Sequence, residues 1–235
     1  MVDQFTDRLD AGRALAARLQ AYHRRADCLV LGLPRGGVPV AFEVALSLGL
    51  PLDVFLVRKL GVPHHEELAL GAIAEGGVRF LNEPLIAELH ISEDAIEEVT
   101  RRELQELDRR AWEYRDGRAP PRVRGHTVIL VDDGLATGAT MLAAVAALRR
   151  MTPEKVVVAV PVGSPEACAE VGRQVDQIVC AIVPSRFHAV GMWFADFEPT
   201  SDIQVRDLLA LAAERSLRLD HGLPDRSAGG QTGTA

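Results

Sequence analysis

The feature that most constrains the fold of this chain lies near its middle, at residues 128–140, with the sequence Val-Ile-Leu-Val-Asp-Asp-Gly-Leu-Ala-Thr-Gly-Ala-Thr. Four consecutive apolar residues are typical of a strand that is buried on both faces, as the strands of parallel sheets are. Asp132 and Asp133 then follow the carboxyl end of that strand, which is where open α/β sheets bind their ligands. The stretch therefore predicts an α/β fold with a ligand site at this strand end.

The turn after the two aspartates has the composition of a phosphate-binding loop. It leads into a predicted helix over 139–151, whose free backbone N–H groups favour an anion, as do the hydroxyls of Thr137 and Thr140. Glycine at position 138 lacks the Cβ that would keep a phosphate from the backbone. Two carboxylates beside this loop would repel a plain phosphate ion, so the ligand must also offer hydroxyls, a metal ion or positive charge. Ribose 5-phosphate meets that demand.

The rest of the chain repeats the strand and helix alternation on both sides of this stretch. Buried-strand patterns occur at 27–33, 52–57, 126–131, 155–162 and 177–183, with helices predicted at 39–48, 139–151 and from Pro165. This order predicts a parallel sheet with right-handed crossovers. Residues 60–120 interrupt it with a predicted hairpin at 69–81 and a long charged helix from Ser92 to Tyr114. We interpret them as an insertion into one domain, 1–220, followed by a disordered tail at 221–235.

Composition excludes several classes of protein. With 48% hydrophobic and 25% charged residues the chain can bury a core, and its net charge of −7 argues against a nucleic-acid partner. A local basic pocket for a small anion remains open. We find no signal peptide and no apolar run near the roughly 18 residues of a membrane span. Three cysteines without metal-site spacing suit a reducing compartment, so we expect a cytoplasmic protein.

Residues 128–140 resemble the fingerprint of the type I phosphoribosyltransferases, which is an apolar strand, two acidic residues and a Thr-Gly-x-Thr loop. Over about residues 5–210 the chain is similar to a bacterial group of uncharacterised phosphoribosyltransferases. The resemblance implies a parallel-sheet fold of that type and transfer of ribose 5-phosphate from phosphoribosyl pyrophosphate to a nitrogen acceptor, such as a nucleobase, with release of pyrophosphate and assistance from Mg²⁺.

The resemblance also implies roles for single residues. Asp132 and Asp133 would hold the ribose hydroxyls and stabilise positive charge on the ribose. The 5-phosphate would be bound by the loop residues Ala136, Thr137, Gly138, Ala139 and Thr140. Gly134 departs from the family pattern, because an apolar residue is usual directly after the acidic pair.

Two further segments would bind the pyrophosphate. The first is the glycine turn with Arg35, Gly36 and Gly37, which in the resembled family binds pyrophosphate through backbone amides, often beside a strained peptide. The second is Arg58 with Lys59, which we place at the end of strand 52–57, on the same sheet edge as the other loops. An ordinary turn and ordinary solvated charge are the competing interpretations.

The insertion holds two further features. Residues 61–71 occupy the place of the family's mobile loop, and we interpret their His64-His65-Glu66-Glu67 run as a polar loop, because adjacent side chains point apart and make a poor metal site. The long charged helix is interpreted as a solvated face, with a homodimer contact as the alternative.

Aromatic residues gather at 187–197, although aromatics make up only 5% of the chain. By resemblance to the purine enzymes of the family, the segment 185–200 would form a hood over the acceptor, with Phe187, Trp193, Phe194 and Asp196 as acceptor-binding residues. A satellite core cluster is an equally good interpretation.

The sequence leaves a second function open. A regulator could use the same pocket to sense a nucleotide or phosphoribosyl pyrophosphate without catalysis, and a receiver-like signalling domain is a weaker third interpretation. Retention of both aspartates, the phosphate loop and the cations favours the enzyme. No residue stands out as a general base for the acceptor.

Overall fold

The computed structural model describes residues 4–62 and 65–220. A five-stranded, fully parallel sheet forms its centre, with the strand order β2-β1-β6-β7-β8. These strands are β1 (Cys28–Gly32), β2 (Leu52–Val54), β6 (Thr127–Val131), β7 (Lys155–Val162) and β8 (Gln177–Ile182). Every residue of β1 and β6 is buried, as the continuous apolar runs predict. The parallel α/β fold class is therefore confirmed.

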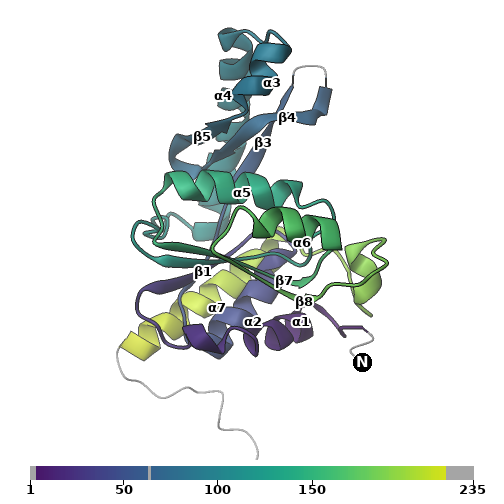
Figure 1. Ribbon diagram of the computed structural model, residues 1–235. Helices are drawn as coiled ribbons and strands as arrows, with labels where there is room; N and C mark the ends of the chain where they lie inside the picture. Colours follow the sequence, from purple (N-terminus) through teal and green to yellow (C-terminus); the bar gives the residue numbers. More distant parts are fainter. Residues whose placement is uncertain (1–3, 63–64, 221–235) are drawn as a thin grey trace, which may run out of the picture.

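Helices cover both faces of the sheet (Figure 1). On one face lie α5 (Ala139–Arg150) and α6 (Pro165–Gly172), and on the other α1 (Arg8–Ala16), α2 (Gly37–Leu48) and α7 (Asp202–Asp220). Two hydrophobic clusters fill the spaces between the layers, one around Leu130 and Leu148, the other around Val44 and Ile129. Short 3₁₀ turns lie at Gln20–Tyr22, Glu75–Gly77 and Val190–Trp193.

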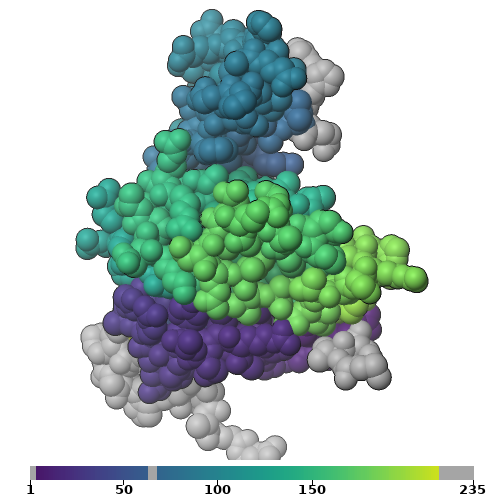
Figure 2. Space-filling view, in the orientation of Figure 1, coloured from purple at the N-terminus to yellow at the C-terminus, as the bar shows by residue number. Residues whose placement is uncertain are grey.

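The insertion builds a second sheet. Its antiparallel strands are β3 (Val57–Val62), β4 (His65–Ala74) and β5 (Val78–Leu81), and its helices are α3 (Glu83–Glu88) and α4 (Glu93–Arg115). The predicted hairpin is the β4–β5 pair, and the predicted long helix is α4 with Ser92 as its N-cap. In Figure 2 this part projects from the sheet layers.

An arginine at the end of α4 fastens the insertion to the parallel sheet. Arg115 is 2% exposed and donates hydrogen bonds to Asp53 and to the carbonyl of Val54 in β2, each at 2.8 Å, and it also pairs with Glu75. A buried charge needs such partners, because removing one of them leaves the other charge unpaired. The contact fixes where α4 lies relative to the strand ends.

Two expectations for the insertion were wrong. Arg58 and Lys59 are not at the end of a parallel strand, because β2 stops at Val54 and both residues lie within β3 of the second sheet. Residues 61–62 and 65–71 are strand residues and not a polar loop, since this sheet buries Val62 and Leu70 against α4. The predicted disordered tail, 221–235, lies outside the described residues.

Candidate functional site

Three loops meet at the carboxyl edge of the parallel sheet. Gly32 at the end of β1 is paired with Val131 at the end of β6, and the N–H of Leu33 donates to the carbonyl of Val131 at 2.8 Å. The loop after β7 is joined to the acidic loop after β6 through Leu135, whose backbone N–H donates to the carbonyl oxygen of Val162 at 2.9 Å. The glycine turn and the acidic loop are thus held side by side by backbone hydrogen bonds.

The glycine turn packs directly on the two aspartates. A Cβ built at Gly36 would lie 2.0 Å from Oδ2 of Asp133, and one built at Gly37 would lie 2.7 Å from the carbonyl oxygen of Val131 and 2.8 Å from Cα of Asp132. Only glycine fits at both positions. From the sequence, these glycines were expected only to bind pyrophosphate. The structure shows that they also let the turn pack against the Asp pair. The peptide bond between Pro34 and Arg35 is cis.

The two aspartates differ in their surroundings. Asp133 accepts a hydrogen bond from Nε of Arg8 at 2.9 Å, and the two side chains are 18% and 11% exposed. Asp132 accepts the backbone N–H of Asp133 at 2.9 Å. Burial, and next the charge of Asp133, raise the pKa of Asp132 well above its ordinary value. Burial also raises the pKa of Asp133, against the opposing effect of Arg8. The site therefore favours a ligand that brings positive charge or hydroxyl donors to this pair.

The loop 136–140 has the geometry of an anion-binding helix start. Gly138 is the N-cap of α5 with φ +76°, a left-handed conformation that favours glycine. Ala136, Thr137, Ala139 and Thr140 are exposed around it, and Oγ1 of Thr137 accepts the N–H of Ala139 at 3.4 Å. Oγ of Ser164 donates to the carbonyl of Ala136 at 2.8 Å and fixes the base of the loop. The predicted phosphate loop is thus assembled beside the Asp pair.

The departure at Gly134 has a steric reason. A Cβ at this position would lie 2.6 Å from Cγ1 of Val190, which belongs to the 3₁₀ turn at 190–193. An apolar side chain at 134 would displace that turn. Gly134 therefore lets the predicted hood segment pack directly onto the acidic loop.

The hood residues divide into buried and accessible ones. Phe194 is 4% exposed and packs in a small cluster with Phe5, at a ring distance of 5.6 Å, so in this arrangement it is not offered to a ligand. Phe187 and Trp193 are half-buried at the edge of that cluster. Asp196 is exposed and accepts the N–H of Glu198 at 3.0 Å, which closes a local turn.

Arg8 connects the hood with the Asp pair. Besides Asp133, it donates to the carbonyl of Glu198 at 2.8 Å, and its guanidinium lies 3.9 Å from the ring centre of Phe197. Such a cation over an aromatic face adds to the attraction. The sequence analysis assigned no role to Arg8 or to Phe197. Arg8 lies 125 positions before Asp133, and no local pattern links them.

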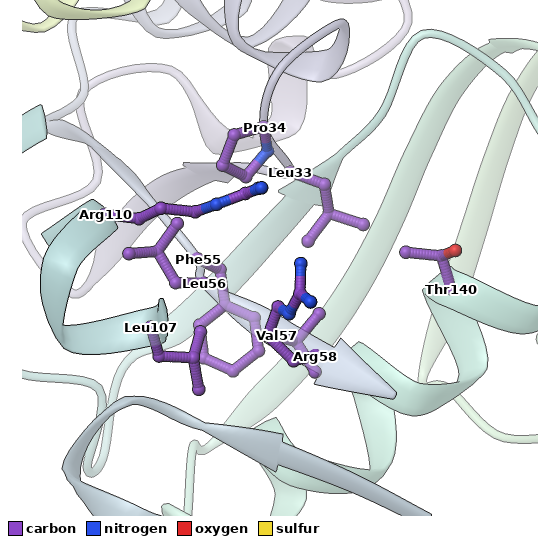
Figure 3. Close-up of a pocket in the computed structure, with 9 residues that line it drawn as sticks. All are labelled: Leu33, Pro34, Phe55, Leu56, Val57, Arg58, Leu107, Arg110 and Thr140. Atoms are coloured by element: carbon purple, nitrogen blue, oxygen red, sulfur yellow. The ribbon is translucent and has the colours of Figure 1, made fainter. Parts of the chain in front are cut away.

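The predicted pyrophosphate residues lie in different places. Arg58 faces a small open pocket, lined also by Leu33, Pro34 and Thr140 (Figure 3). Its guanidinium is held by Glu103 of α4, at 2.7 Å from Nε. Lys59 is exposed, and as the next strand residue it points to the opposite face of β3. Arg35 is half-exposed, and its guanidinium nitrogen Nη1 lies 3.7 Å from Oδ2 of Asp202.

The described residues contain no cluster of three or more His, Cys, Asp or Glu side chains that could hold a metal ion. The side chains of the His64-His65-Glu66-Glu67 run lie outside what the structure describes. Within residues 4–62 and 65–220, no helix is long and apolar enough to cross a membrane.

Comparisons with known proteins point to one family. A family model described as "Phosphoribosyl transferase domain" matches residues 1–190. Two Mycobacterium tuberculosis proteins, named "Putative phosphoribosyl transferase MT0597" (strain CDC 1551) and "Putative phosphoribosyl transferase Rv0571c" (strain H37Rv), are each 50% identical over 201 residues. Those 201 residues are 86% of this chain but 45% of each relative, so the chain spans about half the length of these curated relatives.

A solved structure covers nearly the same region. The crystal structure of the protein TT1426 from Thermus thermophilus is 44% identical, has a TM-score of 0.79, and is matched over 88% of this chain and 97% of its own. Since 88% of this chain is matched, the unmatched share is smaller than the insertion at 60–120, so the match includes at least part of the insertion.

Proposed function

Because this chain belongs to the phosphoribosyl transferase domain family, we propose that it transfers ribose 5-phosphate from phosphoribosyl pyrophosphate to a nitrogen atom of an acceptor, releasing pyrophosphate. The observation that carries the proposal is the junction of three parts at one sheet edge: the Asp pair, the phosphate loop at 136–140, and the glycine turn in contact with both aspartates.

The electrostatics of the site support this reaction. Breaking the bond between ribose and pyrophosphate leaves positive charge on the sugar and negative charge on the leaving group. Asp132 and Asp133 are partly buried carboxylates whose charge is costly in the free protein, so they gain most when positive charge or sugar hydroxyls arrive. Arg35 and Arg58 lie on the side of the glycine turn, where the leaving group would depart.

Magnesium fits the carboxylates that are present. Mg²⁺ usually binds one or two carboxylates together with substrate phosphate oxygens and water. Within the described residues, the hydrogen bond to the Asp132 carboxylate comes from the backbone N–H of Asp133 and is accepted by Oδ1. The carboxylate therefore keeps acceptor capacity for a hydroxyl or a hydrated cation. When bound, the ion would neutralise charge on the pyrophosphate. Ion and substrate would arrive together, because the protein alone supplies no third ligand of the usual kinds in its described part.

We further propose a nucleobase as the acceptor. The hood lies over Gly134, and its half-buried aromatics Phe187 and Trp193 offer flat faces of the kind on which heterocycles stack. A heterocyclic nitrogen needs little help from a general base.

The test is release of pyrophosphate from phosphoribosyl pyrophosphate with Mg²⁺, measured against a panel of nucleobases and other nitrogen heterocycles. The expected result is release with at least one base, abolished or strongly reduced in Asp132→Asn. Binding of ribose 5-phosphate without release from any acceptor would reject the transferase and favour the sensing regulator. Failure to bind ribose 5-phosphate would reject both.

A further inference from the structure

One face of the inserted helix α4 lies along the leaving-group side of the site. Glu103, Leu107, Arg110 and Tyr114 occur at spacings of three and four, which places them on the same side of a helix. Glu103 holds Arg58, and Leu107 is fully buried. Tyr114 bonds to Asp202, the residue that also lies beside Arg35. Arg110 stands between Leu107 and Tyr114 on this face.

Two arginines from different elements point into one pocket (Figure 3). Arg110 reaches from α4 toward Pro34 of the glycine turn, and Arg58 reaches from β3 toward the same space. Thr140, from the start of α5, lines the opposite side. The pocket is small and open to solvent, and most of its lining is apolar. Its charged groups are the two guanidiniums, which suit an anion, and Thr140 of the phosphate loop lies at its edge.

Each arginine is oriented by a glutamate that uses only part of its guanidinium. Glu106 accepts Nε–H of Arg110 at 2.7 Å. Glu103 accepts Nε–H of Arg58 at 2.7 Å, and the same carboxylate oxygen lies 2.6 Å from one terminal nitrogen of Arg58. Among the described residues, the terminal nitrogens of Arg110 have no hydrogen-bond partner. Both side chains are 33% exposed, so those donors are reachable from solvent.

We propose that Arg110 is a pyrophosphate-binding residue and that, with Arg58, it completes the leaving-group site from the inserted helix. This inference rests on the proposed function. It assigns to the insertion a direct role in binding the donor substrate. A guanidinium fork matches phosphate oxygens in a two-point geometry that a single ammonium cannot reproduce.

Arg109 provides a matched control on the same helix. It pairs with the same Glu106, with Nε at 2.8 Å, but it is 59% exposed and does not line the pocket. Replacing either arginine by glutamine leaves Glu106 one arginine partner and keeps a good helix former. Arg109 also pairs with Glu113 at 2.9 Å, so Arg109→Gln removes one more exposed ion pair than Arg110→Gln does, and an exposed pair of this kind contributes little to stability. With respect to the pocket, the two variants differ in whether a lining cation is lost.

The experiment measures binding of inorganic pyrophosphate with Mg²⁺, and separately of ribose 5-phosphate, by calorimetry on the full chain. Arg110→Gln should weaken pyrophosphate binding about 10- to 100-fold, the scale of one charge-assisted hydrogen bond, while Arg109→Gln changes it less than about twofold. Ribose 5-phosphate, which has no pyrophosphate group, should bind all three proteins alike. Arg110→Lys should restore part of the loss.

Three outcomes overturn the inference: no pyrophosphate binding by the wild type, equal effects of the two glutamine variants, or equal loss of both ligands in Arg110→Gln. The proposed function is judged by the separate release assay. A selective loss of pyrophosphate in Arg110→Gln would support the inference even if no acceptor gave turnover. Turnover with equal behaviour of the two variants would reject the inference alone.

Discussion

The substitution Gly36→Ala tests the contact between the glycine turn and the Asp pair. Its Cβ would lie 2.0 Å from Oδ2 of Asp133, and real Cβ atoms essentially never come closer than 3.0 Å, so the turn or the carboxylate must retreat by about 1 Å. Overpacking of this kind costs about 1–3 kcal/mol of unfolding free energy. A displacement of about 1 Å at a reacting centre lowers kcat/KM about 100-fold. We expect both losses together.

The matched control is Gly172→Ala in α6. There the nearest atom to a new Cβ is Cγ2 of Ile178 at 3.4 Å, an ordinary contact, so stability should stay the same or rise slightly. Asp133→Ala removes the clashing oxygen and also the partner of Arg8, so the comparison is made within that background: adding Gly36→Ala to Asp133→Ala should cost little further stability, and neither variant should turn over. Urea unfolding at neutral pH measures stability, and pyrophosphate release measures kcat/KM. If Gly36→Ala behaves like Gly172→Ala in both assays, the turn is not packed on Asp133 and the argument fails.

Three further outcomes are expected. Asp132→Asn should lower turnover about 10²–10³-fold. Burial and Asp133 raise the folded-state pKa of Asp132 above its ordinary 3.8, so the stability that its bound proton contributes is full below 3.8 and is lost as the pH rises through the raised pKa. The variant should therefore have a higher unfolding free energy than wild type at pH 7 and lose this advantage near pH 3. A wild-type pH profile in this variant would contradict the burial argument. Gly138→Val should abolish the rise in melting temperature that ribose 5-phosphate gives the wild type, because valine does not suit φ +76°; equal shifts would count against the phosphate loop. Phe187→Ala and Trp193→Ala should each weaken acceptor binding by about 1–3 kcal/mol if the residue stacks on the base, while the affinity for phosphoribosyl pyrophosphate stays unchanged. A lower melting temperature without a selective loss of acceptor affinity would instead assign that side chain to the satellite core.

Local sequence determined the frame of the site. The apolar run at 128–131 predicts a buried strand, and the structure has β6 there. The Asp pair and the glycine-containing helix start follow it directly in sequence, so their order places them at the carboxyl end of this strand. The same holds for β7, whose predicted bounds at 155–162 match the structure. These features depend on periodicity and turn chemistry over a few residues, which a single sequence displays directly.

Tertiary structure alone decided which distant side chains complete the site. Arg58 belongs to a second sheet because the chain turns away after Val54, a choice made by packing against α4 rather than by the residues of β3 themselves. Arg8 reaches Asp133, and Arg110 reaches the pocket, across long separations in sequence. Trp193 and Phe194 are adjacent aromatic residues, yet Phe194 is buried against Phe5 and Trp193 is only half-buried. Burial and ion pairing are properties of contacts between segments, and the order of residues in one segment carries no record of them.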